Sequence, residues 1–137
     1  MTSSNAHDLR GAGSSDLKGV GILLVEDSWH LGKVMKTLLQ ALGADVAGPA
    51  ATTVEAERLL SEQPPDVAFV DVRLREGELA YGLIDRLHDQ GVPVIVISGY
   101  AVLPLPPAKA AAILQKPVSA AQLLATLRPL IARKAAR

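Results

Sequence analysis

Short apolar runs recur along this chain, and stretches with helical spacing separate them. A short continuous apolar run indicates a strand that is buried on both faces, which is typical of parallel sheets. Strands that alternate with helices are joined by right-handed crossovers, so we expect a parallel sheet with helices on both faces. The pattern predicts five strands, at residues 19–25, 44–48, 66–71, 92–98 and 111–115.

Apolar residues at helical spacing fill the segments between these runs. The first helix is expected to begin after Ser28, a good N-cap, and to end at Gly43, a good C-cap. A third helix is expected over about residues 79–90. Two capping boxes mark the starts of the second and last helices: Thr52 with Glu55, and Ser119 with Gln122. The apolar positions of the first helix are Leu31, Val34, Met35, Leu38 and Leu42.

The segment between the fourth and fifth strands has a different composition. It contains Pro104, Pro106 and Pro107. Proline removes an amide donor and clashes with the preceding helical turn. We therefore expect a fourth helix that is short or irregular, with at most one turn near residues 108–111.

Length and composition bound the domain organisation. The chain has 137 residues, enough for one domain with one core. Residues 1–18 are polar and rich in Gly and Ser, so we expect a disordered arm there, a domain over 19–134 and a tail at 135–137. The formal net charge is zero, which gives no sign of a nucleic-acid partner. No membrane-length apolar run or signal-peptide core occurs, which favours a cytoplasmic protein.

Polar residues of different chemistry follow four of the five predicted strands. Glu26 and Asp27 follow the first, Asp71 ends the third, Ser98 ends the fourth and Lys116 follows the fifth. The carboxyl ends of parallel strands form the ligand-binding edge of an open α/β sheet. Three carboxylates at one place need a cation, and Mg²⁺ suits oxygen ligands and phosphate oxygens. The lysine and serine donors suit a phosphoryl group, which makes Asp71 a candidate nucleophile that forms an aspartyl-phosphate.

In this order, the motifs resemble those of receiver domains of two-component response regulators, over about residues 19–134. The resemblance implies a flavodoxin-like (βα)5 fold, a doubly wound parallel sheet with strand order 2-1-3-4-5. The motifs are the acidic pair in Leu24-Val25-Glu26-Asp27, the phosphorylation strand in Val70-Asp71-Val72-Arg73-Leu74, the Ser/Thr position in Ile97-Ser98-Gly99, and the Lys-Pro position in Gln115-Lys116-Pro117.

The resemblance implies a magnesium site. Asp27 and Asp71 are expected to bind Mg²⁺ directly, and Glu26 is expected to act through water. The backbone carbonyl of Arg73 is expected to complete the set of ligands.

The resemblance also implies a phosphorylation site. Asp71 is expected to accept phosphate from a histidine kinase or a histidine phosphotransfer protein. Lys116 is expected to pair with Asp71 and then with the phosphoryl group, and Ser98 to move toward the phosphoryl oxygens. The Lys116–Pro117 bond is expected to be cis.

The chain departs from the family pattern on the fifth strand. The family usually has an aromatic residue three positions before the lysine, where this chain has Ile113. Tyr100 follows the fourth strand instead, and Ser98-Gly99-Tyr100 partly resembles variant receivers with a Phe-Ala-Thr-Gly-x-Tyr-like run. Tyr100 is a candidate for the residue that switches on phosphorylation, and an exposed loop aromatic without that role is equally compatible with the sequence.

We expect a single-domain phosphoacceptor regulator that signals by binding a downstream protein, as a monomer or weak dimer. The chain ends six residues after Ile131, which leaves no room for a DNA-binding module. It is expected not to be an enzyme beyond Mg²⁺-dependent self-phosphorylation and autodephosphorylation. The alternatives are a non-phosphorylated pseudo-receiver, a receiver excised from a hybrid kinase, and a small aspartyl phosphatase. Arg73 opposes the phosphatase, because such enzymes place an acid at that position.

Overall fold

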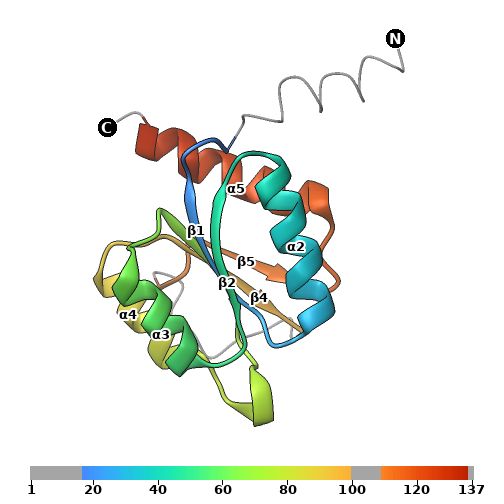
Figure 1. Cartoon of the computed structure of the whole chain (residues 1–137), viewed down its shortest axis with the longest axis vertical. Helices are drawn as coiled ribbons and strands as arrows, with labels where there is room; N and C mark the ends of the chain where they lie inside the picture. Colours follow the sequence, from blue (N-terminus) through green and yellow to red (C-terminus); the bar gives the residue numbers. More distant parts are fainter. Residues whose placement is uncertain (1–16, 100–108, 136–137) are drawn as a thin grey trace.

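A computed structural model describes residues 17–99 and 109–135 of the chain, with side chains as far as residue 132 (Figure 1). Five parallel strands form one sheet in the order β2-β1-β3-β4-β5, which confirms the expected topology. The strands are β1 (Gly21–Val25), β2 (Asp45–Ala50), β3 (Val67–Asp71), β4 (Val94–Ser98) and β5 (Ala112–Gln115).

Helices cover both faces of the sheet, with α3 and α4 on one face and α2 and α5 on the other (Figure 1). Successive side chains of a strand point to opposite faces, so a strand between two helical layers is apolar at every position. Phe69 of β3 packs on the α2 and α5 side, and Val70 packs on the α3 and α4 side. The helices are α2 (Trp29–Ala41), α3 (Thr53–Glu62), α4 (Tyr81–Asp89) and α5 (Ala120–Ala135).

The predicted caps hold the starts of three helices. The Ser28 hydroxyl accepts a hydrogen bond from the Leu31 amide at 3.3 Å, and Ser119 exchanges two hydrogen bonds with Gln122, at 2.9 and 3.1 Å. The Thr52 hydroxyl accepts from the Glu55 amide at 3.2 Å. On the apolar face of α2 the prediction is wrong at Val34, which is 52% exposed.

The core begins before the boundary expected at residue 19. The side chain of Leu17 is fully buried against the core between the sheet and helices α2 and α5. Its amide donates to the carbonyl of Leu42 at 2.9 Å, just after α2. The apolar period of the following strand could not reveal Leu17, because this leucine stands alone in a polar segment.

Strand β2 lies very close to strand β1 and to helix α2 around Gly48 and Pro49. The pairing register shifts between Leu23 and Val25, so β2 bulges at Gly48 and Pro49. Gly48 has a φ of +109°, and a Cβ there would overlap the carbonyl oxygen of Leu24. On the α2 side, a Cβ at Gly32 would lie 2.8 Å from the ring of Pro49. Only glycine therefore allows β1, β2 and α2 to approach this closely.

Two peptide bonds before proline are cis, Lys116–Pro117 as expected and Gly48–Pro49, which the sequence did not indicate. Tyr100 and the proline-rich stretch fall within residues 100–108, outside the described residues, as does most of the expected arm. The form of the fourth helix and the role of Tyr100 therefore stay predictions.

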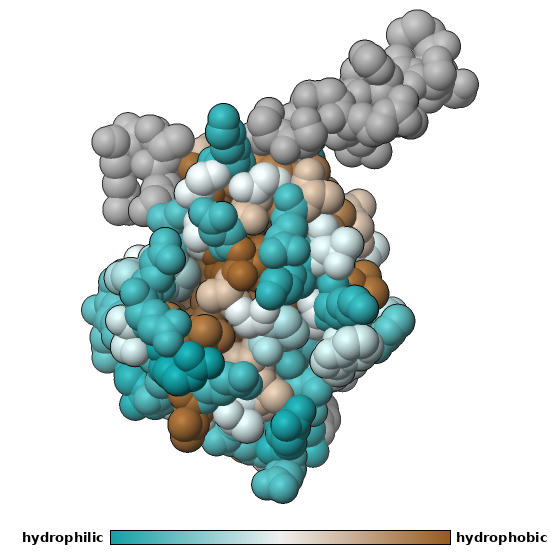
Figure 2. Space-filling model, viewed as in Figure 1, coloured by the Kyte–Doolittle hydropathy of each residue, from teal (hydrophilic) through white to brown (hydrophobic). Residues whose placement is uncertain are grey.

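Most of the surface in the view of Figure 1 is hydrophilic, with small apolar patches where the edge strand β2 reaches the surface between α2 and α3 (Figure 2). Within the described ranges, every helix is too short or too polar to cross a bilayer.

Candidate functional site

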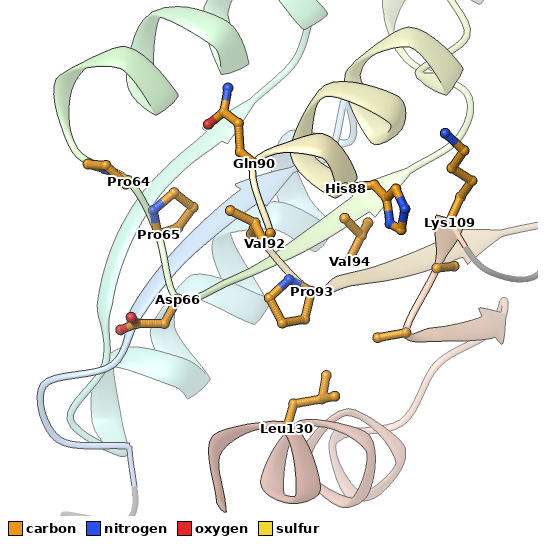
Figure 3. Close-up of a pocket in the computed structure, with 13 residues that line it drawn as sticks. Pro64, Pro65, Asp66, His88, Gln90, Val92, Pro93, Val94, Lys109 and Leu130 are labelled. Carbon is orange, nitrogen blue, oxygen red and sulfur yellow. The ribbon is translucent and has the colours of Figure 1, made fainter. Parts of the chain in front are cut away.

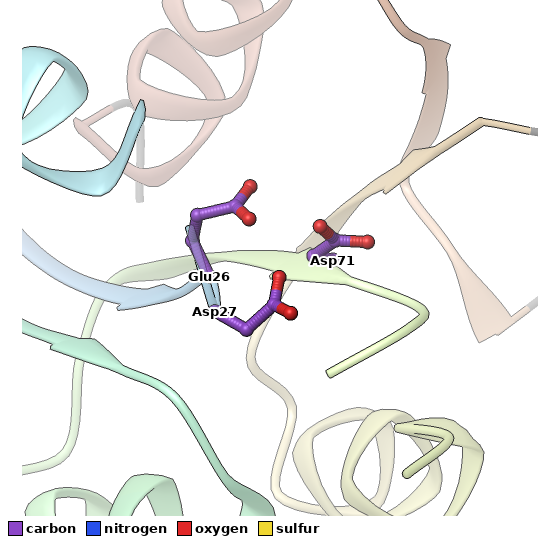
Figure 4. Close-up of side chains that lie close together, drawn as sticks. All are labelled: Glu26, Asp27 and Asp71. Atoms are coloured by element: carbon purple, nitrogen blue, oxygen red, sulfur yellow. The ribbon is translucent and has the colours of Figure 1, made fainter. Parts of the chain in front are cut away.

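Three carboxylates meet at the carboxyl edge of the sheet. Glu26 and Asp27 follow β1, and Asp71 ends β3 (Figure 4). These strands are direct neighbours, with Val25 opposite Val70, so their ends lie side by side. One oxygen from each carboxylate lies within 4.8 Å of the other two. The sequence placed these acids at strand ends, and the parallel register brings them together.

Lys116 crosses to this cluster from the edge of the sheet. Its ammonium donates a hydrogen bond of 2.6 Å to Oδ2 of Asp71 and lies 3.6 Å from Oε1 of Glu26. Strands β5 and β3 do not pair, since β4 lies between them. The amide of Lys116 donates to the carbonyl of Ser98 at 2.7 Å, which holds the lysine over the end of β4. Ser98 itself is 1% exposed.

Glu26 is buried inside the cluster, with 2% of its surface exposed. Its Oε2 accepts from the Ser28 amide at 3.0 Å, and its Oε1 has no hydrogen-bond partner in the described part of the chain. The pKa of Glu26 is raised from 4.5 to about 7, mainly by burial. The nearby Asp71 contributes to this rise, while the Ser28 amide and the Lys116 charge oppose it. The resemblance placed Glu26 at the metal through water, and here its carboxylate itself lies against Lys116.

The Lys116 ammonium stays protonated at neutral pH. Burial acts to lower the pKa of Lys116, but the hydrogen bond to Asp71 and the charges of Glu26 and Asp71 outweigh burial, so the pKa is raised. One ammonium therefore compensates part of the charge of the acidic cluster.

The second oxygen of Asp71 is oriented by the backbone. Oδ1 accepts from the Arg73 amide at 3.2 Å. Each oxygen of Asp71 therefore has a donor of its own, Arg73 for one and Lys116 for the other. The Arg73 side chain is exposed.

The acidic cluster opens into a hollow of about 650 Å³ at the surface. Glu76 and Gly77, from the loop after β3, form part of its wall and were not predicted as site residues. Their position a few residues after the acceptor strand is the one signal in the sequence that could have indicated them. The hollow is lined by Asp27, Asp71, Val72, Arg73, Leu74, Glu76, Gly77, Ser98, Gly99 and Lys116.

The donor set fits a small hard cation. Three carboxylates of Glu26, Asp27 and Asp71 converge where the described residues supply a single ammonium, and the buried Oε1 of Glu26 is left without a hydrogen bond. Oxygen-only sites of this kind suit Mg²⁺. The three expected acidic ligands thus lie together, and the role of the Arg73 carbonyl stays a prediction.

The usual aromatic position on β5 is occupied by Ile113, which is 45% exposed. No bulky ring therefore stands there, as the sequence already indicated.

A second hollow, of about 490 Å³, lies at the opposite edge of the sheet, near the amino ends of β3 and β4 (Figure 3). Asp66 is the only acidic side chain among its lining residues, and His88 and Lys109 are the basic ones. This hollow gathers no cluster of carboxylates and is separate from the site of Asp71.

Comparison with known proteins places this geometry in a family. A family model described as the response regulator receiver domain matches residues 22–128. Among curated proteins, the phyllosphere-induced regulator PhyR of Methylorubrum extorquens is 33% identical over 81 residues, which are 58% of this chain and 30% of that protein. The chain therefore matches less than a third of the length of this relative.

Solved structures share the fold. The response regulator PhyR from Brucella abortus aligns with a TM-score of 0.73 and 22% identity, over 91% of this chain and 54% of that one. A CheY-like receiver domain protein from Methanospirillum hungatei aligns with a TM-score of 0.76 and 26% identity, over 88% of this chain and 99% of that one.

Proposed function

This chain belongs to the response regulator receiver domain family, and from that membership we propose that Asp71 accepts a phosphoryl group from a histidine kinase or histidine phosphotransfer protein. The arrangement of Asp71 carries the proposal. Its carboxylate stands at the floor of an open hollow, with Lys116 on one oxygen and the Arg73 amide on the other. An oxygen nucleophile beside fixed donors suits an incoming phosphate.

In the proposed transfer, the phosphoryl group moves from the donor histidine to Asp71. A carboxylate oxygen of Asp71 attacks the phosphorus atom, and the bond from phosphorus to the imidazole nitrogen of the donor breaks. The imidazole keeps the electron pair and takes up a proton. The product is a mixed anhydride on Asp71. Lys116 and Ser98 both line the hollow, so the proposed partners of its phosphoryl oxygens are the Lys116 ammonium and the Ser98 hydroxyl.

Mg²⁺ is the proposed cofactor, held by Asp27 and Asp71 with Glu26 beside them. When bound, the cation offsets the negative charge of the carboxylates and of the phosphate. The residues of the chain orient the nucleophile: Lys116 and the Arg73 amide fix the two oxygens of Asp71 before the donor arrives.

Signalling by contact with a downstream protein is the proposed output, in the cytoplasm. Family membership supports an exchange with a kinase or phosphotransfer protein and with a downstream target. The pseudo-receiver alternative lacks support from the site, because the acceptor, the lysine and the acidic cluster are all present in one place.

Incubation of the protein with Mg²⁺ and acetyl phosphate, followed by intact-mass measurement, tests this function. We expect a mass gain of one phosphoryl group in the wild-type protein and in the control Asp89→Asn, which alters an exposed acid at the end of α4. Asp71→Asn is expected to abolish the gain. An adduct that persists in Asp71→Asn, or the absence of both adduct and Mg²⁺ binding in the wild type, would contradict the proposal.

A further inference from the structure

The loop between β3 and α4 folds back on itself as a narrow hairpin, residues 72–80. Its base is closed by a hydrogen bond of 2.8 Å from the Ala80 amide to the Val72 carbonyl. Arg73 and Leu79 then pair as an isolated antiparallel bridge. The Leu74 amide donates to the Glu78 carbonyl at 2.7 Å. The hairpin thus starts one residue after Asp71, and a shift of one arm displaces the other.

The side chain of Glu78 fastens this hairpin to the start of α3. Its carboxylate accepts from the Thr53 amide at 2.9 Å and from the Thr53 hydroxyl at 2.7 Å. Thr53 is the first residue of α3, and the first amides of a helix lack partners within the helix. A carboxylate is favoured there by the positive end of the helix dipole. We call this pair of hydrogen bonds the Thr53–Glu78 clasp.

The clasp keeps its charge at neutral pH. The hydrogen bonds from the Thr53 amide and hydroxyl hold the pKa of Glu78 below its usual value of 4.5. The helix has a separate N-cap of its own, because the Thr52 hydroxyl accepts from the Glu55 amide. Glu78 is therefore an additional acceptor that reaches α3 from a distant part of the chain.

The base of the hairpin is anchored in the core by Val72, Leu74 and Ala80, whereas its tip reaches the surface. The three residues at the tip, Arg75, Glu76 and Gly77, are exposed. Glu76 has a φ of +60°, an uncommon conformation for a residue with a side chain. One further polar link to the segment before α3 is a 3.3 Å hydrogen bond from the Arg75 amide to the Ala51 carbonyl. Compared with this 3.3 Å bond, the clasp is the stronger link, because it consists of two shorter hydrogen bonds to a charged acceptor.

A continuous series of contacts connects the clasp to the phosphate site. Glu78 pairs with Leu74, and its neighbour Leu79 pairs with Arg73. The Arg73 amide then holds Oδ1 of Asp71 at 3.2 Å. The same hairpin supplies Glu76 and Gly77 to the wall of the hollow.

We propose that Glu78 is a positioning residue for the phosphate site: through the Thr53–Glu78 clasp it fixes the hairpin, and the hairpin fixes the Asp71 carboxylate. This inference rests on the proposed function, because its consequence is a change in how Asp71 takes up Mg²⁺ and phosphate. A plain helix cap would act differently. It would stabilise α3 and leave the phosphate site of the folded protein unchanged.

The test compares four variants of the full chain with the wild type: Glu78→Ala, Glu78→Gln, Thr53→Val and the double variant Thr53→Val/Glu78→Ala. Glu62→Gln is the matched control, since Glu62 is an exposed acid that pairs with Arg58 at the opposite end of α3 from Thr53. The measurements are Mg²⁺ affinity by calorimetry, the initial rate of phosphorylation by acetyl phosphate, the melting temperature, and amide hydrogen exchange of Arg73.

Glu78→Ala is expected to weaken Mg²⁺ binding and slow phosphorylation by roughly 3- to 10-fold, less than the 10- to 100-fold typical of groups that touch metal ligands directly. It is also expected to speed amide exchange at Arg73. Glu78→Gln should restore most of each loss, because its amide oxygen can still accept from the Thr53 amide. The double variant should match Glu78→Ala, since two groups that act through one contact give non-additive effects. Glu62→Gln should match the wild type.

A lower melting temperature with unchanged Mg²⁺ affinity, phosphorylation rate and Arg73 exchange would overturn the inference and leave Glu78 as a cap. If Glu78→Ala does not fold, Thr53→Val decides, because it removes the hydroxyl donor and keeps the backbone amide. If the wild type takes up neither Mg²⁺ nor phosphate, the proposed function fails, and the exchange of the Arg73 amide still decides whether the clasp positions the hairpin.

Discussion

The Lys116 ammonium lies 2.6 Å from Oδ2 of Asp71, although Lys116 follows β5, Asp71 ends β3, and β4 lies between these two strands. The contact spans the carboxyl edge of the sheet and reaches Glu26 as well, at 3.6 Å. Two buried carboxylates therefore share one ammonium that is about a third exposed. From this shared charge we expect the stability of the domain to depend on Lys116 and on pH.

Replacement of Lys116 by Gln is expected to destabilise the metal-free protein at pH 8. Removing one partner of a fully buried ion pair costs about 3–5 kcal/mol, and the partial exposure of Lys116 reduces the expected loss to about 1–2 kcal/mol. Urea denaturation with a chelator present measures this loss in the free energy of unfolding. Lys33→Gln is the control, because Lys33 lies over the exposed ring of Trp29, where the interaction contributes only about 0.5 kcal/mol. Equal stability of Lys116→Gln and wild type would show that the ammonium does not compensate the cluster.

The raised pKa of Glu26 predicts a loss of stability as pH rises in the absence of metal. Between pH 4.5 and about 7, the folded protein binds a proton at Glu26 that the unfolded chain has already released. The free energy of unfolding therefore falls as pH rises through this window, by up to ~3 kcal/mol for a shift of this size. Urea denaturation at several pH values with a chelator present checks the slope.

Glu26→Gln should remove this part of the pH dependence, because its side chain does not titrate. Glu62→Gln, which changes an exposed acid of α3, should keep the wild-type slope. Saturating Mg²⁺ is expected to oppose the loss, since a cation favours the deprotonated carboxylate. A wild-type slope that matches Glu26→Gln without metal would contradict the prediction.

Gly48→Ala is expected to destabilise the domain by at least about 2 kcal/mol. A Cβ at this position meets the carbonyl oxygen of Leu24 and must adopt a φ of +109°, and both effects oppose folding. Gly82→Ala is the control, and it is expected to have the opposite effect on stability. Gly82 lies within α4 with no atom within 4 Å of an added Cβ, so alanine should stabilise that helix by about 0.5–1 kcal/mol. Thermal denaturation of both variants is the measurement, and a Gly48→Ala protein as stable as wild type would show that β2 can move away from β1.

Leu17→Ala is expected to cost about 2–4 kcal/mol, because it empties a fully buried position in the core next to α2 and α5. Lys18→Ala, at the exposed neighbouring position, should change stability by less than about 0.5 kcal/mol. Chemical denaturation of the two variants distinguishes a domain that begins at Leu17 from one that begins at residue 19. If both variants were equally stable, the domain would begin at residue 19, as the sequence predicted.

The sequence was informative where a short-range pattern decides the structure. Apolar runs located all five strands, and the polar residues that follow them identified the acids and the lysine that meet at one edge. Ser28, Thr52 and Ser119 each act as the caps that their spacing predicted, because a cap depends on residues three positions apart. The ends of strands moved by up to two residues, since the last residues of a strand have no distinctive pattern.

Other features arise from contacts between distant segments, and no local pattern reports them. Glu78 and Thr53 are 25 residues apart, and Leu17 reaches Leu42 over a similar distance. The glycine at position 48 looks like an ordinary turn residue until the Leu24 carbonyl is seen beside it.

By itself, the sequence determined the order of the elements, the parallel sheet and the set of polar residues at its carboxyl edge, because hydrophobic period and strand ends are local properties. Only the tertiary structure decided how those residues share charge. Burial of Glu26, the reach of Lys116 to two carboxylates and the link from Glu78 to Asp71 depend on distances between segments that are far apart in the chain. Electrostatic interaction depends on separation and on exposure to water, and both are set when the helices pack on the sheet.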